Sequence, residues 1–583
     1  MKRRELMLGA GAGAALGLSA CRTVPDRPPV PVGPRPALID IHAHVFNASD
    51  LPVIRFIKIV FLKHYPREAL SVLNVDDPDA LDQLIGLLTF LVGRTSAPSA
   101  AREVRVLNRE EPLERINAVP DDNDKAMVLA IADFLGGKGT AAAGTDGPVR
   151  TDKIQRAIRQ AGAAQGLGVQ GGGGGGAGDD VATAYNAYHS LDLGLVLRWF
   201  ALFTRYRHSL AEQLAHDHER QGFSARLLCP ALVDYDHWLG ERPGSSLQDQ
   251  VAVMGRIARR PTGPRVHGYV AFDPLRQVAW ENGITPDSEG PLALVRRALR
   301  DEGFIGVKLY PPMGYRAMGN ASPCQAYPGE RNDAMARLLD LGPKEEATVA
   351  RCPPPGPHAG SPALGRRLDA AMSQLFDLCV QEHGVVMAHA NDSNGANEQY
   401  SHRADPAHWL EVFRRWPNLH VALAHFGSFD AKSEGRPAGA TGAEASWEWT
   451  LGRYLREHPQ APVYADISYL VEIVGRSAAE QARYDQTLQA WVRAFDPECR
   501  HLMFGTDWMM LGLDKGYPDY TERVYQYFKL RMGFSEAMLE RLFSGNAGVF
   551  LGLRKNDPTR ERLLRFYRRY GVPEHRLPQV PLA

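Results

Sequence analysis

Short runs of apolar residues recur along the chain, and longer amphipathic stretches separate most of them. The apolar runs lack a clean alternation of apolar and polar positions, which is typical of strands buried on both faces of a parallel sheet. Helical periodicity fills several of the intervals, as in 292–302 and 365–382. The predicted strands are residues 37–44, 226–235, 266–273, 304–310, 385–390, 420–426, 463–469 and 501–507.

Eight strands with helices between them favour an α/β fold of the closed (β/α)8 type, the TIM barrel. The barrel would span residues 37–553, and its functional side chains would gather at the carboxyl ends of the strands. An open doubly wound sheet is the alternative, but no GxGxxG motif follows a predicted strand to support it.

Two intervals are too long for simple crossovers. Residues 47–223 predict a large, mainly helical insertion after strand 1, with a long helix around 192–220. Within it, segment 136–178 contains six consecutive glycines at 171–176, and we expect disorder there because these residues have nothing to bury. Residues 311–384 predict a loop-rich insertion after strand 4. Both would form a lid or substrate wall, unless they are elaborations remote from the chemistry.

The N-terminal residues 1–21 have the pattern of an export signal. Arg3 and Arg4 precede a short apolar run, as in twin-arginine signals, and the sequence LSAC ends at Cys21 as in a bacterial lipobox. We expect a lipid on Cys21 and a Pro-rich linker at 22–36, which predicts a lipoprotein on the periplasmic side of a bacterial membrane. An ordinary signal peptide with a chance cysteine is the alternative.

Composition narrows the class of partner. Among 583 residues the formal net charge is +0, whereas nucleic-acid binders show a basic excess, so we expect no nucleic-acid partner.

No CxxC pair supports a structural zinc site, and the sequence does not decide whether Cys324 and Cys352 form a disulfide. The basic tail 554–583 contains a helical pattern at 559–570, which would pack on the barrel, lie solvated, or touch anionic lipid headgroups.

The pair His42 and His44 closes the first predicted strand, where alternate side chains project together. His389, His425 and Asp507 each stand at or near the carboxyl end of a later strand. In a barrel these ends meet at one mouth, and neutral imidazole with carboxylate suits zinc. The joint pattern therefore predicts a divalent metal site.

Several segments resemble the amidohydrolase superfamily, specifically the amidohydrolase-related group that includes aminocarboxymuconate-semialdehyde decarboxylase-like enzymes. The likeness covers about 38–553 apart from the two insertions. The resemblance implies that His42, His44, His389 and Asp507 hold one divalent metal, most plausibly zinc, and that His425 and Asp507 are catalytic. It rests on the segments IDIHAHVFN, GVKLYPPMGY, VVMAHANDSNG, ALAHFGSF, MFGTDW and SGNAGVFLGL.

Lys308 leaves the number of metals open. In binuclear members of the superfamily a carboxylated lysine on this strand bridges two metals, so a second metal follows if Lys308 is carboxylated. We favour one metal, with Lys308 binding substrate. Tyr310, Asn391 and Trp508 are the other predicted substrate contacts, and Asp466 is either a pocket residue or a buried, hydrogen-bonded carboxylate.

The predicted activity is metal-dependent hydrolysis of a small-molecule amide, ester or lactone by a metal-activated water. A non-hydrolytic, metal-dependent decarboxylase of an unsaturated or aromatic acid is the first alternative. A non-catalytic binding lipoprotein is the second.

Overall fold

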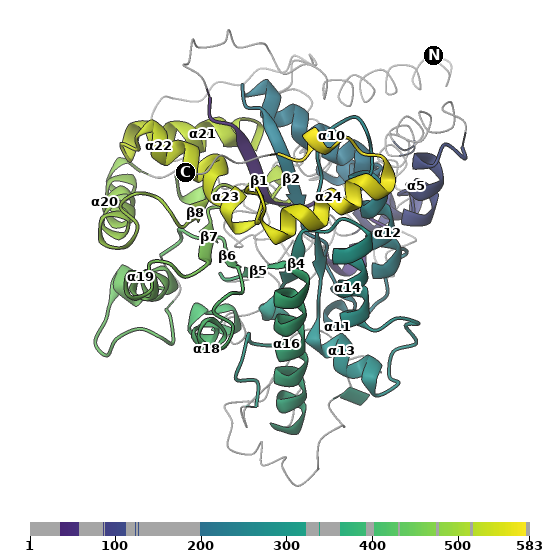
Figure 1. Cartoon of the computed structure of the whole chain (residues 1–583), viewed down its shortest axis with the longest axis horizontal. Helices are drawn as coiled ribbons and strands as arrows, with labels where there is room; N and C mark the ends of the chain where they lie inside the picture. The colour runs from purple at the N-terminus through teal and green to yellow at the C-terminus, as the bar shows by residue number, and fades with distance from the viewer. Residues whose placement is uncertain are drawn as a thin grey trace, which may run out of the picture.

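The computed structural model carries a single chain and describes most of the predicted barrel region (Figure 1). The predicted signal peptide, nearly all of the linker, the Gly-rich segment, Cys324 and Cys352 lie outside the described residues. The described residues are 35–56, 86, 88–111, 123, 126, 199–321, 337–338, 362–391, 402–429, 432–473, 477–513 and 517–578.

Each predicted strand position contains a strand, and all strand pairings are parallel. Strands β1 and β2 form a two-stranded sheet, and β3 to β8 form a six-stranded sheet in chain order. The α/β class with parallel sheets is therefore confirmed. The strands are β1 (Leu38–Ala43), β2 (Ala225–Pro230), β3 (Tyr269–Ala271), β4 (Gly306–Leu309), β5 (Val385–His389), β6 (Val421–Ala424), β7 (Val463–Asp466) and β8 (Leu502–Met503).

Backbone contacts connect the two sheets on both sides. Isolated parallel bridges join Leu228 to Val266, between β2 and the segment before β3, and Ala43 to Trp508, between β1 and the segment after β8. The amide of Ile41 donates to the Phe504 carbonyl at 3.3 Å. Each edge of the small sheet thus reaches an end of the large one.

Helices occupy the intervals between strands. The predicted helices at 292–302 and 365–382 are present as α14 (Pro291–Asp301) and α16 (Pro362–Glu382). Among the described residues, the other α-helices of at least five residues are α5 (Ala100–Leu107), α10 (Arg207–Arg220), α12 (Leu247–Ala258), α13 (Pro274–Glu281), α18 (Leu410–Arg415), α19 (Trp447–Glu457), α20 (Ala478–Phe495), α21 (Tyr520–Gln526), α22 (Glu536–Glu540), α23 (Asn546–Phe550) and α24 (Pro558–Tyr570).

The prediction of one continuous helix around 192–220 is wrong. Residues 203–206 form a turn, and α10 begins only at Arg207 because Tyr206 takes an extended backbone conformation. The buried Arg207 guanidinium is held by Asp50, after β1, and by Glu103 of α5, so tertiary ion pairs fix where α10 starts.

Alternate residues of the strands pack into two separate apolar clusters. In β5, Val385 and Met387 belong to one cluster, whereas Val386 and Ala388 belong to the other. β6 divides in the same way. Strands covered on both faces need apolar residues at every position, which explains the absence of alternation in the sequence.

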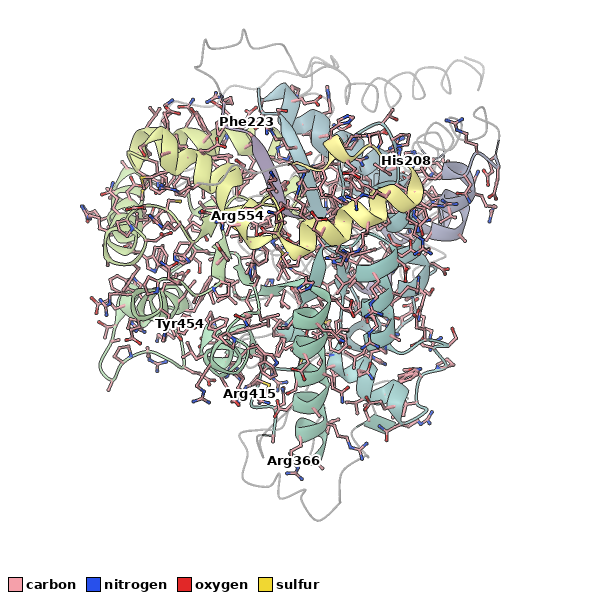
Figure 2. The ribbon with its side chains drawn as sticks, in the orientation of Figure 1. His208, Phe223, Arg366, Arg415, Tyr454 and Arg554 are labelled. Atoms are coloured by element: carbon pink, nitrogen blue, oxygen red, sulfur yellow. The ribbon has the colours of Figure 1, made fainter. Side chains whose placement is uncertain are left out.

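Helix α24 lies across the near side of the molecule in Figures 1 and 2, next to the upper end of α16. Leu563, Phe566 and Tyr567 are buried and share the cluster of Val385 and Met387. The packing alternative for the tail is thus confirmed for this face of the helix. Within the described part of the chain, no helix has the length and apolarity to cross a membrane.

Candidate metal centre

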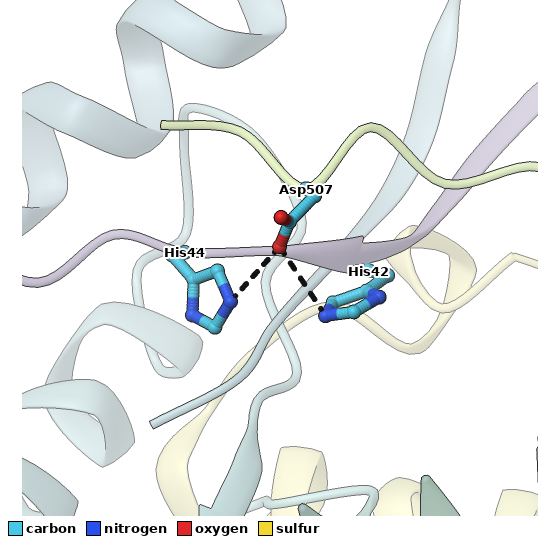
Figure 3. Close-up of side chains that lie close together, drawn as sticks. All are labelled: His42, His44 and Asp507. Atoms are coloured by element: carbon cyan, nitrogen blue, oxygen red, sulfur yellow. Dashed lines mark ion pairs between the residues drawn. The ribbon is translucent and has the colours of Figure 1, made fainter. Parts of the chain in front are cut away.

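The end of β1 and the segment after β8 bring three predicted ligands together (Figure 3). Asp507 Oδ1 lies 3.1 Å from His44 Nε2 and 3.5 Å from His42 Nε2. One ligand atom from each of the three residues lies within 4.8 Å of the other two, and all three side chains are buried. Both histidines therefore point to the same carboxylate oxygen, as the His-x-His spacing predicts.

Hydrogen bonds on the far side of each imidazole set its orientation. His44 Nδ1 lies 2.9 Å from the Ala231 carbonyl, which can only accept, so Nδ1 carries the proton and Nε2 offers a lone pair. His42 Nδ1 lies 2.9 Å from Ser468 Oγ and 3.3 Å from an oxygen of the buried Asp466 carboxylate. A partner on the second nitrogen is the usual arrangement of metal-binding histidines.

Asp507 is arranged to stay ionised. Burial raises the pKa of the Asp507 carboxyl, but His44, His42 and His425, where they carry a proton towards it, outweigh burial and hold the pKa of Asp507 well below its usual range. Its Oδ1 is buried without a hydrogen-bond partner in the described part of the chain. A buried anionic oxygen that faces imidazole lone pairs fits a divalent cation, which would satisfy all of them at once.

The backbone at this site adopts conformations that few residues accept. Asp507 has φ 56° and His425 has φ 66°, both in the left-handed region. Gly505 allows β8 to approach β1, because a Cβ there would lie 2.9 Å from the Cβ of His42. Such strain at functional positions persists only where surrounding contacts fix the chain.

Those contacts come from Asp40, which sequence analysis did not single out. Its carboxylate accepts from the Thr506 amide at 3.1 Å and from the Thr506 hydroxyl at 2.7 Å. His218 of α10 lies 3.2 Å from the same carboxylate. Asp40 therefore fastens the residue before Asp507 to the strand that carries His42. A charged residue within the apolar run 37–44 was the available signal.

His389 and His425 lie beside this group. Their ring centroids are 4.6 Å apart, and the ring of His425 is 5.0 Å from that of His42. Burial lowers the pKa of His425 to about 4, with Asp507 opposing and His42 adding to the effect, so this imidazole is neutral at pH 7. His389 does not belong to the tight three-residue group, and its role as fourth ligand stays a prediction.

Lys308 of β4 is buried, and its Nζ lies 2.8 Å from His42 Nε2. Burial lowers its pKa to about 8, while Asp466 and Asp507 act in the opposite direction. The amine thus faces the same nitrogen that a metal would use. This position is compatible with both predicted roles, a substrate contact and, after carboxylation, a bridge between two metals.

The remaining predicted substrate contacts differ in their surroundings. The Tyr310 ring centroid lies 4.5 Å from that of His389, and Asn391 Nδ2 donates weakly to the His425 carbonyl at 3.4 Å. Trp508 is fully buried, and its indole N–H donates to Tyr517. The indole N–H of Trp508 therefore already has a partner within the protein, whereas Tyr310 and Asn391 lie next to the histidines.

A small cavity opens beside His44. Tyr235, in the segment after β2, packs edge-on against Tyr310 with ring centroids 5.3 Å apart, a position that no sequence pattern predicts. Asp466, in contrast, ends β7, and its buried carboxylate accepts a hydrogen bond from the Ser468 amide at 3.0 Å. This contact supports the interpretation of Asp466 as a buried, hydrogen-bonded carboxylate rather than a pocket residue. The cavity is lined by His44, Leu232, Val233, Asp234, Tyr235, Ala271, Phe272, Lys308, Tyr310 and Met313.

Several solved structures resemble the chain at low identity. An amidohydrolase from Burkholderia multivorans with bound HEPES is 16% identical, and the match covers 60% of this chain and 91% of that one with a TM-score of 0.34. A manganese complex of 5-carboxyvanillate decarboxylase from Novosphingobium aromaticivorans is 12% identical, with 68% and 92% covered and a TM-score of 0.33. TM-scores this low carry no conclusion about this chain. No curated protein matches it.

A match to a protein-family sequence model gives a firmer relationship than the structural similarities. The sequence model of the family described as Amidohydrolase matches residues 269–553. This region runs from β3 beyond β8 and includes Lys308, His389, His425 and Asp507, while His42 and His44 precede it. Residues 269–553 are therefore similar to the amidohydrolase family, in agreement with the resemblance seen in the sequence.

Proposed function

We propose that the protein is a metal-dependent hydrolase that acts on an amide, ester or lactone of a small molecule. The observation that carries the proposal is the convergence of His42 Nε2, His44 Nε2 and Asp507 Oδ1 in a buried site. Lys308 contacts only the His42 nitrogen, so the His44 lone pair and the anionic Asp507 oxygen still repel each other unless a cation lies between them. His42, His44 and Asp507 would hold a divalent metal, with zinc the first candidate and His389 a further ligand.

When bound, such an ion supplies Lewis acidity, which activates water and polarises a carbonyl group. The chain contributes the remaining steps through its own side chains. If His42 binds through Nε2, its Nδ1–H donates to Ser468 Oγ at 2.9 Å, and the Ser468 hydroxyl can donate to His425 Nδ1 at 3.1 Å. This order leaves the proton of neutral His425 on Nε2, the tautomer that can donate to a developing oxyanion.

The competing contact at His425 is the Ser468 carbonyl, 3.3 Å from Nδ1, which would favour the opposite tautomer. The shorter approach of the hydroxyl favours the donor tautomer. Asp507, ionised beside both histidines, is the group available to accept a proton from water and pass it to a leaving group.

Decarboxylation is the second candidate because of Lys308. A buried amine next to the proposed metal ligands would attract the carboxylate of an acidic substrate. A screen of carbonyl compounds and of unsaturated or aromatic acids, read as released acid and as released carbon dioxide, separates the two reactions. A metal-loaded protein without turnover on either set would favour the binding lipoprotein instead.

The same proposal includes a closed eight-stranded barrel. It is supported by the parallel strand order and by the bridges from β2 towards β3 and from β1 to the segment after β8. In this arrangement the three ligands lie at the carboxyl-terminal mouth, where TIM-barrel sites are built.

The metal centre can be tested by removing its carboxylate. In Asp507→Asn the neutral amide no longer offsets the charge of the ion, and we expect metal affinity to fall by about 100-fold or more together with activity. Metal content by elemental analysis and affinity by competition with a chelator measure the change. Asp485→Asn on α20 is the matched control, because this carboxylate pairs with Arg531 at the surface. Equal metal content in Asp507→Asn and the parent would overturn the proposal.

We also propose that the chain is exported and attached to a membrane by a lipid on Cys21, as the lipobox pattern suggests. Cys21→Ser would then move the protein from the membrane fraction to the soluble fraction and abolish incorporation of labelled fatty acid. Unchanged labelling in this variant would contradict the anchor.

A further inference from the structure

The segment after β6 carries His425 and has an unusual backbone. His425, Gly427 and Phe429 all have positive φ, at 66°, 128° and 55°. Position 427 requires glycine, because a Cβ there would lie 2.6 Å from Leu470 Cδ1. Alternate residues with positive φ turn successive amide groups towards one side, and such a concave row of N–H groups suits an anion or another strong acceptor.

The acceptor on that side is Glu448 of α19. Its Oε1 accepts from the Phe429 amide at 2.8 Å and from the Gly427 amide at 3.3 Å. The Ser428 hydroxyl faces the same oxygen at 3.4 Å. Glu448 has no exposed surface. One buried oxygen thus receives donors from three consecutive residues, the segment 427–429.

Glu448 also stands in the first turn of α19, where a carboxylate stabilises a helix through the helix dipole. An exposed acid would serve that purpose equally well, so the dipole does not account for the contacts with the distant segment 427–429. Burial raises the pKa of Glu448, while the amides of Phe429 and Gly427 act in the opposite direction. Because a buried carboxyl is costly unless it is hydrogen-bonded, Glu448 and the segment depend on each other.

His425 is held from both sides. Its own amide lies 3.3 Å from Asp466 Oδ1, and the Phe426 amide donates to the Asp466 carbonyl at 2.8 Å. Glu448 then holds the next three residues. A residue other than glycine keeps a left-handed conformation only where surrounding contacts impose it. The course of the segment 427–429 is therefore part of what places the His425 ring.

We propose that Glu448 is a positioning residue for His425, whose catalytic role rests on the proposed function. By gathering the segment 427–429 around one oxygen, Glu448 fixes the backbone conformation that directs the His425 imidazole towards His42 and His389. In this role Glu448 acts through the backbone rather than by contact with the substrate. Misplacing a catalytic group by about 1 Å can cost about 100-fold in rate, so loss of the acceptor should be visible in kcat.

Three variants of the full chain separate this role from packing. Glu448→Met keeps the length of the side chain but removes both oxygens, and Glu448→Asp keeps the carboxyl but ends one methylene short of the Phe429 amide. Glu448→Gln keeps Oε1 as an acceptor. On a substrate identified by the proposed screen, kcat should fall about 100-fold in Glu448→Met and Glu448→Asp with KM nearly unchanged, and should stay within about threefold of the parent in Glu448→Gln.

A second readout needs no turnover. The nitrogen chemical shifts of ¹⁵N-labelled histidine, with the His425 signals assigned by comparison with His425→Gln, should change in Glu448→Met and Glu448→Asp and stay at the parent values in Glu448→Gln. Metal content should be the same in all three variants, because His425 is not one of the proposed ligands. If Glu448→Met does not fold, Glu448→Asp carries the comparison.

Asp496→Leu is the matched control. Asp496 is also buried and also accepts from two loop amides, those of Arg500 at 2.6 Å and His501 at 3.0 Å, but it lies before the start of β8. We expect this variant to lose stability without a change in kcat or in the His425 signals.

The proposal is overturned by parent-like shifts and kcat in Glu448→Met and Glu448→Asp, by equal changes in Asp496→Leu, or by a Glu448→Gln variant that loses as much as Glu448→Met. A parent without turnover on any substrate would refute the proposed hydrolase, and the His425 shifts would still decide the role of Glu448.

Discussion

At the scale of single residues, the proposed chemistry depends on which nitrogen of each imidazole carries a proton. Backbone and hydroxyl partners decide this for His44 and His42, and Ser468 links His42 to His425 through one oxygen. The hydroxyl is therefore a positioning group for two histidines rather than a catalytic group itself. Its effect should appear in the tautomer of His425 before it appears in stability.

Ser468→Ala tests this link. Without the hydroxyl, the Ser468 carbonyl becomes the remaining partner of His425 Nδ1, so the proton should move from Nε2 to Nδ1. We expect the nitrogen chemical shifts of ¹⁵N-labelled histidine to report this change. On a substrate identified by the proposed screen, kcat should fall about 100-fold with KM nearly unchanged. Ser477→Ala, at the N-cap of α20, should leave both readings unchanged. Unaltered shifts in Ser468→Ala would contradict the tautomer assignment.

At the scale of elements, α24 is fixed by a buried hydrogen-bond chain. Tyr567 OH lies 2.9 Å from His267 Nε2, and His267 Nδ1 donates to the Gly303 carbonyl at 2.7 Å. Burial lowers the pKa of His267 to about 3, with the Gly303 contact opposing it. The helix thus depends on a histidine that must remain neutral.

This arrangement predicts loss of stability in acid. Because the folded pKa is depressed, the unfolded chain takes up a proton first as the pH falls through 6.5, and the folded state loses relative stability until the pH reaches about 3. At pH 5 the loss from His267 should be about 2 kcal/mol relative to pH 7.5. Urea unfolding at both pH values should show it in the parent. His267→Asn should show a pH dependence smaller by that amount, and an equal dependence in both proteins would refute the assignment.

At the scale of the whole molecule, buried ion pairs join three described parts of the segment between β1 and β2 to one another. Arg207 of α10 contacts Asp50 and Glu103, and His208 reinforces Glu103 at 2.8 Å. Burial raises the pKa of Asp50 despite the nearby guanidinium. The pairing is therefore required for two carboxylates to be buried at this junction.

Arg207→Leu should destabilise the protein by about 3–5 kcal/mol, because it leaves the buried Asp50 without its ion-pair partner and Glu103 with His208 alone. Denaturant unfolding followed by tryptophan fluorescence and by circular dichroism measures the loss, and the two signals should shift together if the junction belongs to one cooperative unit. Arg415→Leu, at an exposed pair with Glu411, should cost less than about 1 kcal/mol. A shift no larger in Arg207→Leu than in this control would contradict the argument.

The sequence alone located the strands, and it singled out His42, His44 and Asp507, which the structure brings together. Parallel strands buried on both faces must be apolar throughout, so the eight runs stand out in the chain. Histidines and an aspartate at their carboxyl ends stand out for the opposite reason, because polar groups there need a function or a partner. The spacing of His42 and His44 placed both on one site because side chains two residues apart in a strand project together.

Only the tertiary structure decided which buried polar groups support that site and where some elements begin. Asp40, Ser468 and Tyr235 act through partners that lie far away in the sequence, and no local pattern encodes such pairs. The start of α10 depends in the same way on Arg207 and its distant carboxylates. Local periodicity reports which face of an element is buried, whereas the identity of the group opposite it depends on how the strands are brought together.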